Sequence, residues 1–250
     1  MMDYPWKRAW IVGGSTGLGA EFVSQLDDAG IAVTVSARSK QGLDDLCAPL
    51  RTAVSLPLDI TDAAAVNGAV GTVMDAESGS PDLIILNAAI YTPMAGANMD
   101  ADIMADMMTT NFIGVARVLQ CLMAYRKHPK KITVAVLGSP SGWTGLPGGI
   151  GYGPTKAAII NMVEGLKPEL DRTSIDIRLV NPGFIRTRLT DKNKFKMPQL
   201  MEADDAAARA LKGLAKGKFE TAFPNPFVGF LKFMGILPYR LFFALTKRAM

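Results

Sequence analysis

The chain has 250 residues, of which 49% are hydrophobic and 20% are charged. A composition this apolar supports a sizeable core and excludes intrinsic disorder. The net charge of +4 comes from scattered basic residues, which argues against nucleic-acid binding and is compatible with a small anionic ligand. With two unpaired cysteines, one histidine and no apolar signal core at the start, we expect a reducing, cytoplasmic setting and no metal site.

Short apolar runs alternate with longer helical patterns along the chain. The expected strands are Trp10–Val12, Ala32–Val35, Leu83–Leu86, Thr133–Leu137 and Ile175–Val180. The expected helices between them are Leu18–Ala29, Ser39–Leu50, Ala63–Ala76, Ala101–Tyr125 and Thr155–Leu170. Because the strands are almost continuously apolar, both of their faces should be buried under helices. We predict a single domain over residues 1–250, an α/β, Rossmann-like, doubly wound parallel sheet in three α/β/α layers.

The first expected strand runs into a glycine-rich turn that opens a helix. The turn consists of Gly13, Gly14, Ser15, Thr16, Gly17, Leu18 and Gly19. Glycines let the backbone turn sharply and approach a ligand, and the helix N-terminus offers N–H groups to an anion. The turn is therefore a candidate phosphate cradle. The alternative is a tight strand-to-helix connection with no ligand.

The segment after the second expected strand indicates which nucleotide fits. In dinucleotide-binding sites of Rossmann-type sheets, an acidic residue after the second strand binds the ribose 2′-hydroxyl of NAD(H), whereas an arginine there suits the 2′-phosphate of NADP(H). Here no carboxylate follows Val35, but Arg38 does, with the hydroxyls of Ser36 and Ser39 beside it. We expect NADP(H) to be preferred over NAD(H); the alternative is a solvated arginine and NAD(H). Further along, Asp59 either lies beside the adenine or caps the following helix.

Polar motifs continue after the later strands. In chain order they are Asn87-Ala88-Ala89, Asn111, Gly138-Ser139-Pro140-Ser141-Gly142, Tyr152-Gly153-Pro154-Thr155-Lys156 and Asn181-Pro182-Gly183. Taken singly, each residue is also an ordinary turn, core or surface residue. As an ordered set, from about Trp10 to Thr187, they resemble the short-chain dehydrogenase/reductase family of the compact, single-domain type.

The resemblance implies catalytic roles for four of these residues. Tyr152 matches the catalytic acid/base, and Lys156, one helical turn further on, would lower the pKa of Tyr152 and hold the nicotinamide ribose. Ser139 matches the residue that hydrogen-bonds the reacting carbonyl, with Ser141 as the second candidate. Asn111 matches the helix asparagine that supports a water relay to Lys156.

The same resemblance implies further cofactor contacts. Asn87 matches the strand-end residue near the adenosine ribose. The segment that flanks the nicotinamide is matched by Pro182, Gly183 and Thr187. The chain departs from the family pattern at Val12, where threonine is usual, and at Ala89, where glycine is typical.

The implied reaction is hydride transfer between a nicotinamide and a carbonyl or secondary alcohol. We expect a reductase of a lipophilic ketone or aldehyde; the alternative is a non-catalytic NADP(H)-binding regulator on the same fold. A sugar-nucleotide epimerase or dehydratase is disfavoured by the chain length and the glycine spacing. The family also implies a homodimer or homotetramer, paired through the helices Ala101–Tyr125 and Thr155–Leu170.

Two segments late in the chain are set apart by composition. A basic substrate lid is expected at about residues 184–201; its basic residues are Arg186, Arg188, Lys192, Lys194 and Lys196. The candidates for an apolar pocket wall are Trp143, Leu146 and Met197.

A hydrophobic tail is expected at about residues 219–250, too interrupted by charge to span a membrane. It packs over the pocket or a subunit interface, or else makes peripheral contact with a membrane surface.

Overall fold

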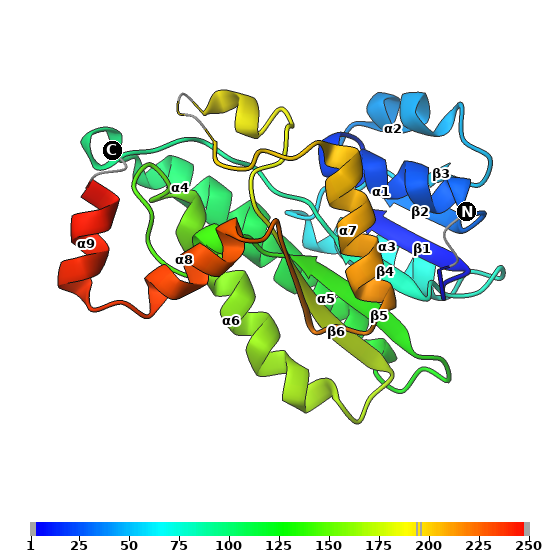
Figure 1. The fold of residues 1–250 in the computed structure, drawn as a ribbon. Coiled ribbons are helices and arrows are strands. Elements are labelled where there is room, and N and C mark those ends of the chain that lie inside the picture. Colours follow the sequence, from blue (N-terminus) through cyan, green and yellow to red (C-terminus); the bar gives the residue numbers. More distant parts are fainter. Residues whose placement is uncertain (1–3, 194, 196, 248–250) are drawn as a thin grey trace.

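The computed structural model describes residues 4–193, 195 and 197–247. Its strands are β1 (Arg8–Val12), β2 (Ala32–Ser36), β3 (Val54–Ser55), β4 (Leu83–Leu86), β5 (Ile132–Leu137), β6 (Ile175–Pro182) and β7 (Glu220–Phe223). They form one parallel sheet in the order β3-β2-β1-β4-β5-β6-β7 (Figure 1). Because the strand order reverses beside β1, the sheet is doubly wound, and the predicted Rossmann-like α/β/α architecture is confirmed.

Helices connect the strands and cover both faces of the sheet. The α-helices are α1 (Gly17–Asp28), α2 (Lys40–Cys47), α3 (Ala63–Met74), α4 (Ala101–Met108), α5 (Val115–Leu122), α6 (Tyr152–Leu170), α7 (Ala203–Ala215), α8 (Phe227–Gly235) and α9 (Tyr239–Lys247). Short 3₁₀ helices lie at Gly96–Asn98, Met123–Tyr125, Pro140–Gly142 and Thr190–Lys192. A π-helix, Thr109–Gly114, joins α4 to α5.

Alternating side chains of the strands build a separate core on each face. In β1, Trp10 and Val12 pack with α3, α5 and α6, whereas Ile11 packs with α1 and α7 on the other face. All three side chains are buried, as the apolar strand pattern predicts for a parallel sheet covered on both sides. The indole of Trp10 donates a hydrogen bond to the Ser36 hydroxyl (2.9 Å), which satisfies both polar groups inside this core.

The predicted helix Ala101–Tyr125 is interrupted by the π-helix. By length and composition it is the one helix among the described residues that matches a membrane span. Part of this apolar character belongs to the core, because Met107, Val115 and Val118 are buried inside the protein; 39% of the apolar window is buried in all. The π-turn widens the helix at the point where Asn111 faces the interior.

The last part of the chain differs from the expected continuous tail. Residues 220–223 form strand β7 at the edge of the sheet, beside β6. Helix α7, which precedes β7, packs against α1. Helix α8 follows β7 and packs against it, and α9 stands at one edge of the molecule (Figure 1). The parallel strands place all of their carboxyl ends on one side, where the loops of interest gather.

Candidate active site

The loops at the carboxyl ends of the strands enclose one cavity of about 870 Å³. That volume suits a dinucleotide together with a small substrate. Most of the predicted site residues line it. They are Gly13, Ser15, Thr16, Gly17, Leu18, Arg38, Asp59, Asn87, Ser139, Tyr152, Lys156, Pro182, Gly183 and Thr187. Gly19 and Asn111 are not among its lining residues.

The glycine-rich turn has the backbone of an anion cradle. Gly13 and Gly17 adopt φ angles of +85° and +56°, which other residues rarely adopt. Thr16 is the N-cap of α1, but its side chain makes no capping hydrogen bond, and the first turn holds no acidic residue. The N–H groups of this helix end therefore point to the cavity without a side-chain acceptor, the arrangement that binds phosphate. The turn fits the pyrophosphate of a dinucleotide.

Two neighbours hold this turn in shape. The side-chain amide of Asn87, at the end of β4, donates to the carbonyl oxygen of Gly13 (2.7 Å). Gly19 has a packing role, because a Cβ at this position would lie 2.1 Å from the same oxygen. Asn87 therefore both supports the glycine-rich turn and lines the cavity.

Arg38 lies on the exposed rim of the cavity, just after β2. Within the described residues, it forms no hydrogen bond or ion pair. The two serines beside it are differently placed: Ser36 is fully buried with Trp10, so it cannot reach a ligand, and the Ser39 hydroxyl caps α2 by accepting from Gly42 N (3.1 Å). A 2′-phosphate at this rim would meet a guanidinium that no carboxylate of the described chain binds directly, since the nearby Asp59 carboxylate is hydrogen-bonded to Thr61.

Asp59 combines parts of both readings that the sequence left open. It lines the cavity, and its carboxylate accepts from the backbone N and the hydroxyl of Thr61 (2.8 and 2.7 Å). These hydrogen bonds, together with the nearby charge of Arg38, lower the pKa of Asp59. The cap of α3 is Asp62 instead, whose side chain accepts from the N–H groups of Ala64 and Ala65.

Tyr152 and Lys156 share one face of the first turn of α6. The Lys156 ammonium lies 5.6 Å from the centroid of the Tyr152 ring and donates to the carbonyl oxygen of Leu137 (2.7 Å). Lys156 is 2% exposed, and this burial lowers its pKa to about 8. Burial, and secondly the neighbouring Tyr91, raise the pKa of Tyr152. The predicted lowering is therefore wrong for this structure: desolvation outweighs an ammonium that is bonded to a backbone carbonyl.

The two serines after β5 are hydrogen-bonded to each other. The Ser139 hydroxyl oxygen accepts from the backbone N (3.2 Å) and the hydroxyl (2.9 Å) of Ser141. Since Ser139 accepts both bonds, its own proton remains available for a ligand oxygen. Ser141 is the supporting member of the pair, and this arrangement favours Ser139 as the residue that contacts a carbonyl.

Asn111 positions backbone in this structure. Its carboxamide accepts from Ile90 N (2.7 Å) and donates to Ile90 O (2.9 Å) and to the Thr155 hydroxyl (3.2 Å). The side chain is fully buried and makes no hydrogen bond to Lys156. These contacts match an asparagine that is satisfied inside a helix interface, and they fix the loop after β4 against α6.

Sequence reasoning missed Tyr91, which lines the cavity beside Tyr152. The two rings meet edge to face, with centroids 5.2 Å apart. The Tyr91 hydroxyl donates to Asn193 Oδ1 (2.6 Å), and the Lys192 ammonium donates to the backbone oxygen of Tyr91 (2.7 Å). The only available signal was the position of Tyr91, four residues after Asn87 and directly past a recognised motif.

The segment predicted as a lid contributes to the cavity wall through described residues that include Phe184, Thr187 and Phe195. Its base is fixed by an isolated bridge between Ile185 and Met201, and Thr190–Lys192 form a 3₁₀ turn within it. Two of its basic residues, Lys194 and Lys196, lie outside the described residues. The apolar part of the cavity wall includes Leu146, Phe184, Phe195, Phe227 and Leu231. Of the three predicted wall residues, Leu146 belongs to it, whereas Trp143 and Met197 are absent from the described lining.

Comparison with known proteins agrees with this doubly wound sheet and its nucleotide-type cavity. The family model for short chain dehydrogenases matches residues 7–197, so the chain belongs to the short-chain dehydrogenase/reductase family, a family of oxidoreductases. An uncharacterized oxidoreductase of Myxococcus xanthus is 29% identical over 99% of both chains.

Solved structures share the fold at lower identity. A short chain dehydrogenase from Burkholderia cenocepacia in complex with NADP superposes with a TM-score of 0.84 at 21% identity, covering 98% of this chain and 99% of the other. A short chain dehydrogenase/reductase from Burkholderia phymatum in complex with NAD has a TM-score of 0.81 at 17% identity, covering 93% and 94%. At these identities the likeness concerns the fold alone.

Proposed function

We propose that this chain, as a single domain, is an NADP(H)-dependent oxidoreductase that interconverts a carbonyl group and a secondary alcohol on a lipophilic substrate. The observation that carries the proposal is that Ser139, Tyr152 and Lys156 line the same cavity as the glycine-rich turn. A protein that only senses a nucleotide needs the glycine turn but not the three polar groups. The cytoplasm is the compartment we propose for it.

The bound cofactor supplies the hydride, and the side chains control the proton and the charge. In the reductive direction the free hydroxyl of Ser139 donates a hydrogen bond to the carbonyl oxygen, keeps its own proton and steadies the developing negative charge. Tyr152 delivers the proton that completes the alcohol. Lys156, held by the Leu137 carbonyl, places its ammonium beside the phenol ring, and this charge offsets part of the cost that burial adds to loss of the Tyr152 proton.

The apolar wall supports a lipophilic substrate. Phe184 packs against Phe227 and Phe195, with ring centroids 5.5 and 5.6 Å apart, and all three line the cavity. Burying an apolar substrate surface against these rings contributes roughly 25 cal/mol per Å². A compact polar ketone would leave this wall unused.

The first test compares the wild type with Tyr152→Phe on a panel of aliphatic and aromatic ketones and aldehydes, following NADPH oxidation. The phenylalanine keeps the ring but lacks the proton donor, so turnover should fall by about 10²–10⁴-fold. NADPH binding, measured by fluorescence titration, should be unchanged. Near wild-type turnover in the variant would remove Tyr152 from the mechanism, and inactivity of the wild type on the whole panel would favour the regulator.

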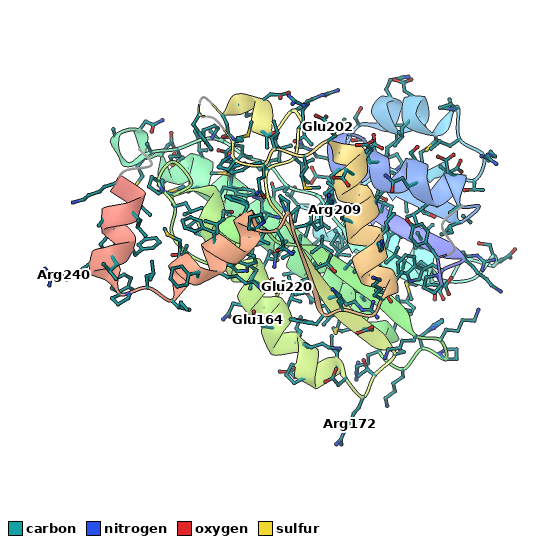
Figure 2. The ribbon with its side chains drawn as sticks, viewed as in Figure 1. Glu164, Arg172, Glu202, Arg209, Glu220 and Arg240 are labelled. Carbon is teal, nitrogen blue, oxygen red and sulfur yellow. The ribbon has the colours of Figure 1, made fainter. Side chains whose placement is uncertain are left out.

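The second test concerns the cofactor preference and uses Arg38→Ala. A charge-assisted hydrogen bond contributes roughly 1.5–3 kcal/mol, so NADPH binding should weaken by about ten- to a hundredfold while NADH binding stays nearly constant. Arg172→Ala is the matched control, because Arg172 is also exposed but lies beyond the far end of α6 (Figure 2). Equal losses for both cofactors, or wild-type preference for NADH, would overturn the assignment to NADP(H).

A further inference from the structure

Large apolar side chains are exposed on the outer faces of α8 and α9. Of the eleven exposed large hydrophobic residues in the described chain, seven lie between residues 230 and 245. Phe230, Phe233 and Phe243 are each more than half exposed, and Tyr239 is 77% exposed. So dense a group of exposed aromatic and aliphatic side chains is unusual for a surface that faces only water.

The two helices are fixed to the body by their inner faces. In α8, Val228, Leu231 and Met234 are buried, and the Lys232 ammonium pairs with Glu220 and lies 4.8 Å from the centroid of the Trp143 ring. In α9, which stands at the edge of the molecule, Phe242 is buried (Figure 1). The outer face, defined here as Phe230, Phe233, Ile236, Tyr239, Leu241 and Phe243, is therefore left exposed, although the Tyr239 and Phe243 rings stack on each other and Phe243 also contacts Phe242.

The charged residues of α8, α9 and the end of the chain all have one sign. After Glu220 the sequence contains no aspartate or glutamate, whereas it contains Lys232, Arg240, Lys247 and Arg248. Neither Arg240 nor Lys247 forms a hydrogen bond or ion pair in the part of the chain that the structure describes. Figure 2 shows Arg240 directed away from the body of the protein. The free cations thus flank the exposed aromatic residues.

The combination of exposed apolar side chains with unpaired cations favours one class of partner over another. A second copy packed on the same face by a two-fold axis would bring the like charges of Arg240 and Lys247 together. An anionic lipid surface instead pairs with the cations and accepts the apolar side chains, as interfacial helices require. Each helix has nine residues, too few to cross a bilayer, so contact is restricted to the surface. We propose that α8 and α9 dock the protein on an anionic lipid bilayer through the outer face.

The experiment is co-sedimentation of the full-length protein with vesicles of phosphatidylcholine alone or mixed with phosphatidylglycerol. The wild type should bind the mixed vesicles, and binding should weaken as salt is raised. The double variant Phe233→Ser, Phe243→Ser should bind at least about tenfold more weakly, since it loses two apolar side chains. Val54→Ser is the matched control: Val54 is 59% exposed, but it lies in β3 at the opposite edge of the sheet.

A second variant tests the charges and does not depend on the apolar face. Arg240→Gln with Lys247→Gln should lower binding to the anionic vesicles by about tenfold or more and leave binding to phosphatidylcholine unchanged. Absence of wild-type binding, or unchanged binding by either double variant, would overturn the proposal. It is also overturned if the serine variant converts a wild-type dimer to a monomer without any vesicle binding, because the outer face would then be a subunit interface.

Discussion

Replacing Lys156 by methionine should change how the stability of the protein depends on pH. Methionine fills similar space but carries no charge. Lys156 is buried, and the pKa falls from 10.5 to about 8 in the folded protein. The unfolded chain therefore binds more protons than the folded chain between these values, so the wild type gains stability as the pH rises through this window.

The size of the effect follows from the two pKa values. A drop from 10.5 to about 8 corresponds to roughly 3 kcal/mol of destabilisation while the lysine is charged. Part of this is recovered on raising the pH: between about pH 7 and about pH 9.5 the wild type should gain on the order of 2 kcal/mol relative to the variant. Other groups also titrate in this range, so the difference between the two proteins is the informative quantity.

Urea unfolding at a series of pH values, without added nucleotide, gives this difference directly. The free energy of unfolding of the wild type minus that of Lys156→Met should rise steadily from neutral pH to pH 9.5. A flat or falling difference would mean that the ammonium is adequately solvated by the Leu137 carbonyl and its surroundings. The lowered pKa of Lys156 would then be refuted.

Two further predictions concern stability and assembly. Burial raises the pKa of Asp27, but hydrogen bonds from Thr52 and Arg51 outweigh it and lower the pKa overall. Asp27→Asn should therefore lower the free energy of unfolding by about 2 kcal/mol at neutral pH, as measured by urea unfolding. The variant should also lose less stability than the wild type as the pH falls below the usual carboxyl range, because it has no carboxylate to protonate at this position. Equal loss of stability in acid for the two proteins would contradict this. We also expect a homodimer or homotetramer through Ala101–Tyr125 and Thr155–Leu170, and a strictly monomeric mass by light scattering at micromolar concentration would exclude it.

The sequence predicted the sheet well because strand burial leaves a strong signal. The five expected strands lie within β1, β2, β4, β5 and β6. The remaining two gave weak signals for different reasons. Strand β3 has only two residues, and β7 begins with Glu220 and was included in the hydrophobic tail. A short edge strand depends on its neighbour for pairing and carries little pattern of its own.

The candidate site was predictable where a sequence motif fixes the local backbone, and less so where tertiary contacts determine which groups a side chain meets. The glycine turn and the spacing of Tyr152 and Lys156 were read directly from the sequence. The π-turn at Asn111 inserts extra backbone without disturbing the apolar pattern, so its hydrogen bonds to Ile90 were not foreseeable. The same holds for the contact of Tyr91 with Tyr152, which joins the loop after β4 to the start of α6, 61 positions further along the sequence.

Helix α8 makes the C-terminal segment part of the cavity wall, which has a consequence for how the chain tolerates shortening. Phe227 and Leu231 line the cavity, and Lys232 neutralises Glu220, which in turn accepts from the Asn181 amide (2.7 Å) at the end of β6. Ending the chain after residue 226 would admit water beside Tyr152 and Lys156. With desolvation relieved, the pKa of the tyrosine would fall and that of the lysine would rise toward their values in water. Affinity tags are therefore better placed at the N-terminus, and a truncated protein would report altered chemistry even if its sheet remained folded.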